Sequence, residues 1–176
     1  MWLSSEGKDV PVSAAQVKEL RDKTGAGIMD SKRALEEAGG DLKKAEEILN
    51  VKGLASASKK AGRETSEGLV VSYIHTGGRV GSLVELNCET DFVARTDEFA
   101  ALGRNLAMQI AAMTPLYVDR ESIPEDVEDI NDEQLLLEQE YIRDSSMKVG
   151  DLVKEAISKL GENIRVRRFS RFELGG

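Results

Sequence analysis

Apolar residues over positions 12–54 recur at helical spacing, in short runs that glycines separate. Ser13 and Gln16 have the spacing of a capping box, which predicts the start of a first helix. Asp41 is suited to cap a third helix. Because each run is short, its stability must come mostly from burying its apolar stripe against the others. The pattern predicts a three-helix bundle over 12–54, with helix ends at Gly25 and Gly27, at Gly39 and Gly40, and at Gly53. Because so small a bundle has little interior for a pocket, we interpret it as a docking domain, with a bundle that has no separate role as the open alternative.

The pattern changes after this bundle. Residues 55–67 are small, polar or charged and carry no sustained apolar stripe, so we place a linker there. Positions 69–75 and 79–87 are rich in Val, Ile and Leu, and a Thr-Gly-Gly turn between them predicts a β-hairpin. Gly81 inside the second strand indicates either a bulge or a close packing contact.

The rest of the chain completes a predicted core domain over 68–176. Thr96 is suited to cap a long amphipathic helix, and a later helix around 152–160 should end at Gly161. Strands, then helices, then a returning strand predict an α+β fold with a small antiparallel sheet packed on helices. The apolar residues assigned to the returning strand are Ile164, Val166, Phe172 and Leu174. Residues 1–11 have no periodicity and are interpreted as a flexible lead-in.

The segment 119–140 stands out by its charge, with ten acidic residues and one basic residue, Arg120. Such a run is typical of a solvated surface, so we expect a loop there, followed by a short amphipathic helix around 135–141.

Composition narrows the class of function. The hydrophobic fraction of 40% and the charged fraction of 32% are those of a globular protein. A formal charge of -8 disfavours direct nucleic-acid binding, because that depends on a basic surface. The single cysteine, Cys88, excludes an intramolecular disulfide and indicates a reducing compartment. With no long apolar run and no signal-like segment, no membrane association is expected.

Two groups of residues suggest other functions, catalysis by a cysteine and binding of RNA. Cys88 and His75 are the types of residue that form a nucleophile and base pair, although they fall at the ends of different strands and no oxyanion hole is recognisable. Four arginines beside two phenylalanines on the last predicted strand could bind RNA by stacking and charge, or could protect a sheet edge. These residues are Arg165, Arg167, Arg168, Arg171, Phe169 and Phe172. No P-loop pattern is present, so the chain itself shows no nucleotide motif.

The segment from Thr90 to Val93 is unusual, because a short connection between a strand and a helix cap contains a large apolar pair. Exposed aromatics on loops often bind partners, whereas a buried Phe92 would belong to the core. From these residues alone, both interpretations stay open.

Several collinear motifs resemble the elongation factor Ts family over nearly the whole span 12–174. They are VKELR at 17–21, TGAGIMD at 24–30, EG at 67–68, YIH at 73–75, VELNCETDFVAR at 84–95, LAMQIAA at 106–112, GENI at 161–164 and RRF at 167–169.

The resemblance implies an N-terminal ubiquitin-associated-like three-helix bundle that docks on the nucleotide domain of elongation factor Tu. It further implies a role for Thr90, Asp91, Phe92 and Val93, with Asp91 and Phe92 intruding beside the partner's magnesium and phosphate site. The activity implied is guanine-nucleotide exchange without bond chemistry, metal or cofactor. Weaker partner contacts are expected at Lys23, Gly25 and Met29.

The chain differs from the long form of this family, because it has one apparent core subdomain and a shortened middle. Short relatives can dimerise, so a homodimer is a hypothesis alongside binding to GDP-bound and nucleotide-free elongation factor Tu. The expected location is the bacterial cytoplasm, with a plastid stroma or mitochondrial matrix as the alternative.

Overall fold

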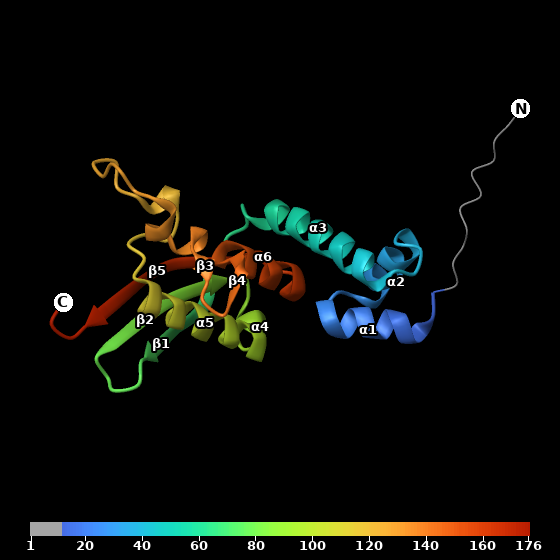
Figure 1. Ribbon diagram of the computed structural model, residues 1–176, viewed down its shortest axis with the longest axis horizontal. Coiled ribbons are helices and arrows are strands. Elements are labelled where there is room, and N and C mark those ends of the chain that lie inside the picture. Colours follow the sequence, from blue (N-terminus) through green and yellow to red (C-terminus); the bar gives the residue numbers. More distant parts are fainter. Residues whose placement is uncertain (1–11) are drawn as a thin grey trace, which may run out of the picture. The chain divides into compact units, whose positions relative to one another are not determined.

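The computed structural model describes residues 12–176, so the predicted lead-in lies outside the described residues (Figure 1). The chain divides into two compact units, the first ending at Ser56 and the second beginning at Ala57. The mixture of helices and small antiparallel sheets is α+β, as predicted. The predicted limits 12–54, 55–67 and 68–176 remain a prediction.

The first unit consists of α1 (Ala14–Thr24), α2 (Ile28–Glu37) and most of α3 (Leu42–Lys60). The predicted capping box is confirmed, since the Ser13 hydroxyl accepts from the Gln16 N–H and the Gln16 carboxamide accepts from the Ser13 N–H. Burial of the apolar stripes provides the stability that short helices lack. The fully buried apolar residues described in this unit are Leu20, Ala34, Leu35 and Ala45.

The predicted end of the third helix at Gly53 is wrong, because α3 continues to Lys60. A glycine inside a helix costs only about 1 kcal/mol relative to alanine. The residues after Gly53 are mostly Ala, Ser and Lys, and Ala57 is buried in the core of the second unit. Tertiary packing therefore overrides the local stop signal.

The predicted hairpin is confirmed as β1 (Glu67–Ile74) and β2 (Val80–Cys88), which pair antiparallel. At Gly81 the close-contact alternative is the correct one, because the pairing with β1 is regular there. A Cβ added to Gly81 would lie 2.5 Å from the Ile74 Cδ1.

The returning strand is β5 (Ile164–Glu173), which pairs with β2 and gives the sheet order β1-β2-β5. Its register shifts between Glu85 and Leu86 of β2, where Arg167 is the extra residue on β5. A bulge of this kind reverses the alternation of side chains. Ile164 and Val166 are therefore buried, whereas Phe172 is exposed, and the predicted apolar alternation does not continue through the strand.

Two helices pack against the sheet and form the main core with it (Figure 1). These are α5 (Asp97–Met113), capped by Thr96 as predicted, and α6 (Val149–Leu160), which ends at a left-handed Gly161. The largest fully buried side chains of this core include Phe99, Leu86, Leu106, Ile110 and Leu136. None of the described helices is long and apolar enough to span a membrane.

The helix predicted around 135–141 is wrong. That region contains only short 3₁₀ turns, Asp132–Gln134 and Leu136–Glu138, after an earlier one at Arg120–Ser122. It then enters a small hairpin of β3 (Glu140–Tyr141) and β4 (Asp144–Lys148).

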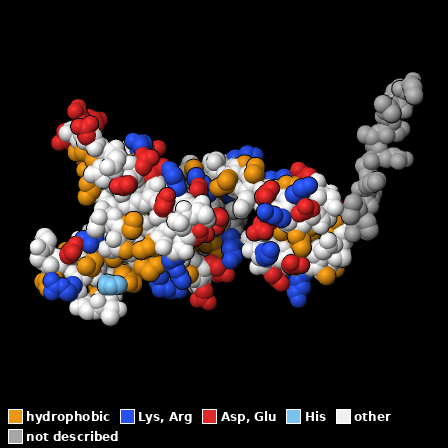
Figure 2. All heavy atoms as spheres, in the orientation of Figure 1, with side chains coloured by type: hydrophobic (Ala, Val, Ile, Leu, Met, Phe, Trp, Pro, Cys, Tyr) orange, Lys and Arg blue, Asp and Glu red, His pale blue; other side chains and the backbone are white. Residues whose placement is uncertain are grey.

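The buried Gln109 of α5 explains this outcome. Its amide donates to the Glu140 carbonyl at 3.0 Å and its carbonyl accepts from the Ile142 N–H at 2.8 Å. A fully buried amide needs such partners, and an extended backbone supplies them better than a helix would. The acidic side chains of the preceding segment gather at the surface, as predicted (Figure 2).

Candidate partner-binding site

The segment predicted as a short connection is a single helical turn, α4 (Asp91–Ala94), between β2 and α5. Thr90 is its N-cap, with an extended backbone and a hydroxyl that accepts from the Val93 N–H at 3.5 Å. The Arg95 N–H closes the turn on the Asp91 carbonyl at 3.2 Å. An isolated turn of four residues is not stable in water, so its surroundings must hold it.

The structure decides between the two interpretations of Phe92. Its side chain is 80% exposed, which is the largest value among the large hydrophobic residues described. Val93 and Ala94 are 8% and 5% exposed and belong to the core. The turn is thus attached to the core by its second half, and the core-inserted alternative for Phe92 is wrong.

Asp91 lies beside Phe92 at the start of the same turn. Its carboxylate forms an ion pair with Arg95 at 2.8 Å, and both side chains are well exposed. Exposed pairs of this kind contribute about 0.5 kcal/mol, so this one can be exchanged for a partner's cation at little cost. An aromatic ring and a carboxylate are therefore presented together on a supported turn.

The weaker candidates belong to the first unit. Gly25 is the left-handed C-cap of α1, Lys23 lies 3.9 Å from Glu46 across an exposed ion pair, and Met29 is 62% exposed. Ile28, the residue before Met29 at the start of α2, is also exposed, at 59%. No local signal distinguishes Ile28 from a core residue, because a helix can bury two neighbouring apolar positions, as Ala34 and Leu35 of α2 show.

The nucleophile and base pair is contradicted by the hairpin register. Cys88 pairs with Glu67, whereas His75 follows Ile74, which pairs with Gly81. At about 3.3 Å per strand residue, the two side chains lie about 25 Å apart. Cys88 is fully buried, its Sγ donates to the Thr90 carbonyl, and burial together with Glu162 raises its pKa to about 11.

Cys88 should accordingly react slowly with a disulfide reagent such as dithionitrobenzoate. At pH 8 a thiol with this pKa is only about one part in a thousand ionised, and the thiolate is the reactive form. We expect at least about 100-fold slower labelling in the native protein than in urea. Equal rates in the two states, measured by absorbance, would show that Cys88 is accessible and activated.

The arginine strand does not form a stacking surface. The bulge places Phe169 against the core and Phe172 on the opposite face. Arg168 forms an ion pair with Glu85 at 2.7 Å, and Arg171 donates to the Ala111 carbonyl at 3.0 Å. These contacts favour the structural interpretation, in which the arginines protect a sheet edge.

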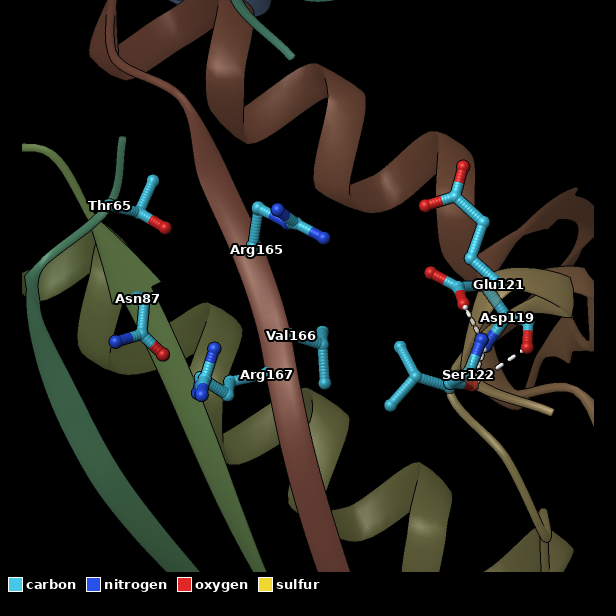
Figure 3. Close-up of a pocket in the computed structure, with 9 residues that line it drawn as sticks. Thr65, Asn87, Asp119, Glu121, Ser122, Arg165, Val166 and Arg167 are labelled. Atoms are coloured by element: carbon cyan, nitrogen blue, oxygen red, sulfur yellow. Dashed lines mark hydrogen bonds between the residues drawn. The ribbon is translucent and has the colours of Figure 1, made fainter. Parts of the chain in front are cut away.

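A hollow of about 210 Å³ lies beside β5 (Figure 3). Arg165 extends from β5 toward Asp119 and Glu121, so the hollow joins groups of opposite charge. Two guanidinium groups and two carboxylates leave little net attraction for a phosphate. Its lining residues are Thr65, Asn87, Val118, Asp119, Glu121, Ser122, Arg165, Val166 and Arg167.

Comparisons with known proteins place the chain in a family. A family model described as "Elongation factor TS" matches residues 12–135. Proteins named elongation factor Ts from Thermotoga petrophila and Carboxydothermus hydrogenoformans are each 51% identical to it. The matches cover 93% of this chain and 96% and 89% of those relatives.

A protein of the same name from Thermoanaerobacter pseudethanolicus is 52% identical, over 93% of this chain and 95% of its own length. These relatives are bacterial, and they give no support to an organellar origin. The chain belongs to the elongation factor Ts family of translation elongation factors.

Proposed function

We propose that this protein binds elongation factor Tu in its GDP-bound and nucleotide-free forms and promotes release of GDP, so that GTP can be loaded. The observation that carries the proposal is the exposed Phe92 on a capped turn whose next two residues are buried. An apolar ring held in this way gains free energy only when a partner covers it. Membership of the elongation factor Ts family supports elongation factor Tu as the partner.

The mechanism follows from linkage between two ligands of one partner. An exchange factor binds the nucleotide-free partner more tightly than the nucleotide-bound partner. Bound nucleotide must therefore lower the partner's affinity for the exchange factor by the same ratio as the exchange factor lowers its affinity for the nucleotide. Insertion of Phe92, with Asp91 beside it, would displace partner side chains next to the magnesium and phosphate site. GDP is then held less well, and no bond is made or broken, so the protein is an exchange factor and not an enzyme.

The first unit is proposed as the docking domain, a ubiquitin-associated-like bundle on the partner's nucleotide domain. Ile28 and Met29 offer exposed apolar surface at the start of α2, next to the Gly25 cap and Lys23. Such surface supports binding of a protein partner more than catalysis, because a bundle this small has little interior for a pocket. The proposed place of action is the bacterial cytoplasm.

Release of labelled GDP from elongation factor Tu tests this function directly. With excess unlabelled nucleotide, catalytic amounts of the protein should accelerate release many-fold, because one molecule serves many partners in turn. Excess GDP should also dissociate the complex, as reciprocity requires. A release rate equal to the spontaneous rate at every concentration of the protein would reject the proposal.

A homodimer is proposed as well, on a separate observation. The sheet face opposite α5 is open, and the apolar residues on it are exposed by 44% to 70%. They lie on neighbouring strands in register, with Ile74 and Phe172 on either side of Gly81. The exposed apolar residues of this face are Val70, Ile74, Leu83 and Phe172.

Substitution Ile74→Lys should break such a dimer. Covering the open face would bury an unpaired ammonium group, and we expect the dissociation constant to rise by about 100-fold or more. Sedimentation equilibrium measures this change, with Leu116→Lys as the control, since Leu116 is exposed but lies outside the sheet. A monomer mass for the unaltered protein over a wide concentration range would contradict the dimer.

A further inference from the structure

The connection between α6 and β5 holds the turn that bears Phe92. Three hydrogen bonds reach the Glu162 carboxylate from the residues that precede α4. The Glu89 and Thr90 N–H groups donate to Oε2 at 3.1 and 3.0 Å, and the Thr90 hydroxyl donates to Oε1 at 2.6 Å. Bonds to a charged acceptor are shorter and about twice as strong as neutral ones.

The carboxylate also fixes the direction of the Thr90 hydroxyl. Because both oxygens of an ionised carboxylate only accept, the hydroxyl proton must point toward Glu162. A lone pair of Thr90 Oγ1 is then free to accept from the Val93 N–H, which is the cap of α4. Glu162 thus acts on the cap through Thr90, and through the cap on the turn.

Glu162 is itself firmly placed. Gly161 before it ends α6 in the left-handed conformation, with its N–H bonded to the Ile157 carbonyl. Asn163 after it is 1% exposed and donates to the carbonyls of Ala61 and Arg63 at 3.2 and 2.7 Å.

A second bond runs in the opposite direction across the same contact. The Glu89 carboxylate accepts from the Asn163 N–H at 2.6 Å, while the Glu89 N–H donates to Glu162. The two short segments, 89–90 and 162–163, are therefore joined reciprocally through backbone donors. Contacts of this kind define a position more closely than apolar packing alone, because hydrogen bonds are directional.

We propose that Glu162 is a positioning residue for nucleotide exchange: its carboxylate orients Thr90 and thereby holds the Phe92 turn in the geometry that the partner meets. The effect of Glu162 on GDP release rests on the proposed function. Its effect on the order of the Phe92 turn can be measured in the free protein. Such support favours binding, because a four-residue turn that is disordered in the free protein must become ordered in the complex, and that ordering reduces the net binding free energy.

The test compares Glu162→Gln with Glu138→Gln, which removes an acid paired with Lys148 on the surface of the same unit. Amide hydrogen exchange of the free protein should become about tenfold faster over 89–95 in Glu162→Gln alone, since a neutral amide replaces a charged acceptor. The rates of amide hydrogen exchange in α5 and the melting temperature should stay close to those of the unaltered protein. The maximal rate of GDP release should fall about tenfold, with a smaller change in the concentration giving half of that rate.

A double variant decides whether the effect passes through Thr90. In a Thr90→Val background, Glu162→Gln should add little further loss, because residues that act as a unit are not additive. Thr90→Ser keeps the hydroxyl and should retain most of the activity. The positioning role would be overturned if the losses in the rate of GDP release were additive. It would also be overturned if amide hydrogen exchange over 89–95 were unchanged in Glu162→Gln.

The two proposals fail separately. If the unaltered protein releases no GDP, the proposed function is lost, yet the exchange rates over 89–95 still show whether Glu162 holds the turn. If GDP release is stimulated and Glu162→Gln loosens the turn without lowering the maximal rate, the function stands and the positioning role is rejected.

Discussion

Phe92→Ala is expected to remove most of the stimulated GDP release while leaving the fold intact. Truncation of a central aromatic in a protein interface costs about 2 kcal/mol or more, which corresponds to about 30-fold in rate. The folded protein itself loses little, because the ring is 80% exposed and stabilises no core contact. We expect the free energy of unfolding to change by less than about 0.5 kcal/mol.

The measurement is release of labelled GDP from elongation factor Tu, together with urea unfolding of each variant. Leu116→Ala is the matched control, since Leu116 is a large apolar side chain of the same unit with 57% exposure. Its release rate should equal that of the unaltered protein. If Phe92→Ala also released GDP at the full rate, the function would stand and the mechanism would move away from this ring.

Gly68→Ala should produce the largest loss of stability proposed for this chain, about 3 kcal/mol. Gly68 has a φ of 154°, and an added Cβ would lie 2.1 Å from the Leu86 carbonyl oxygen and 2.8 Å from the Asn87 Cα. Both are backbone atoms of the central strand, which cannot turn aside as a flexible side chain can. The variant must separate β1 from β2 at this point or bend both strands.

Gly78→Ala separates the steric cost from the conformational one. Gly78 has a φ of 67° and no atom within 4 Å of an added Cβ, so only the left-handed backbone is penalised, by about 1 kcal/mol. Urea unfolding with a common slope gives both values. Equal losses at the two glycines would mean that β1 and β2 adjust freely and that the close approach at Gly68 is unimportant.

Much of the fold was predictable from residues that are near one another in the chain. The Ser13 and Gln16 box, the Thr96 cap, the glycine helix end at Gly161 and the hairpin turn all formed as predicted. Each depends on hydrogen bonds or backbone angles within a few residues. The failures at Gly53 and around 135–141 involve burial of Ala57 and the amide of Gln109, and neither is visible in a local window.

The candidate site divides in the same way. The unusual apolar pair at Phe92 and Val93 and the family resemblance were evident in the sequence, whereas the cap at Thr90 was not predicted, because the segment was expected to be a short connection. That Phe92 faces solvent while Val93 faces the core depended on how the turn joins β2. The contribution of Glu162 could not be predicted, because 72 positions separate it from Thr90 along the chain.

By itself, the sequence determined most helix ends and the hairpin, because short-range hydrogen bonding and glycine conformations encode them. The order of these elements indicated the α+β class, and the resemblance of several collinear motifs indicated the family. Only the tertiary structure decided that β5 has a bulge at Arg167 and that Phe172 and Phe92 are exposed to solvent. It also decided that Glu162 supports the turn that bears Phe92. These features depend on which distant donors, acceptors and apolar surfaces meet when the sheet closes. That pairing is set by the free energy of the whole core, and no local pattern specifies it.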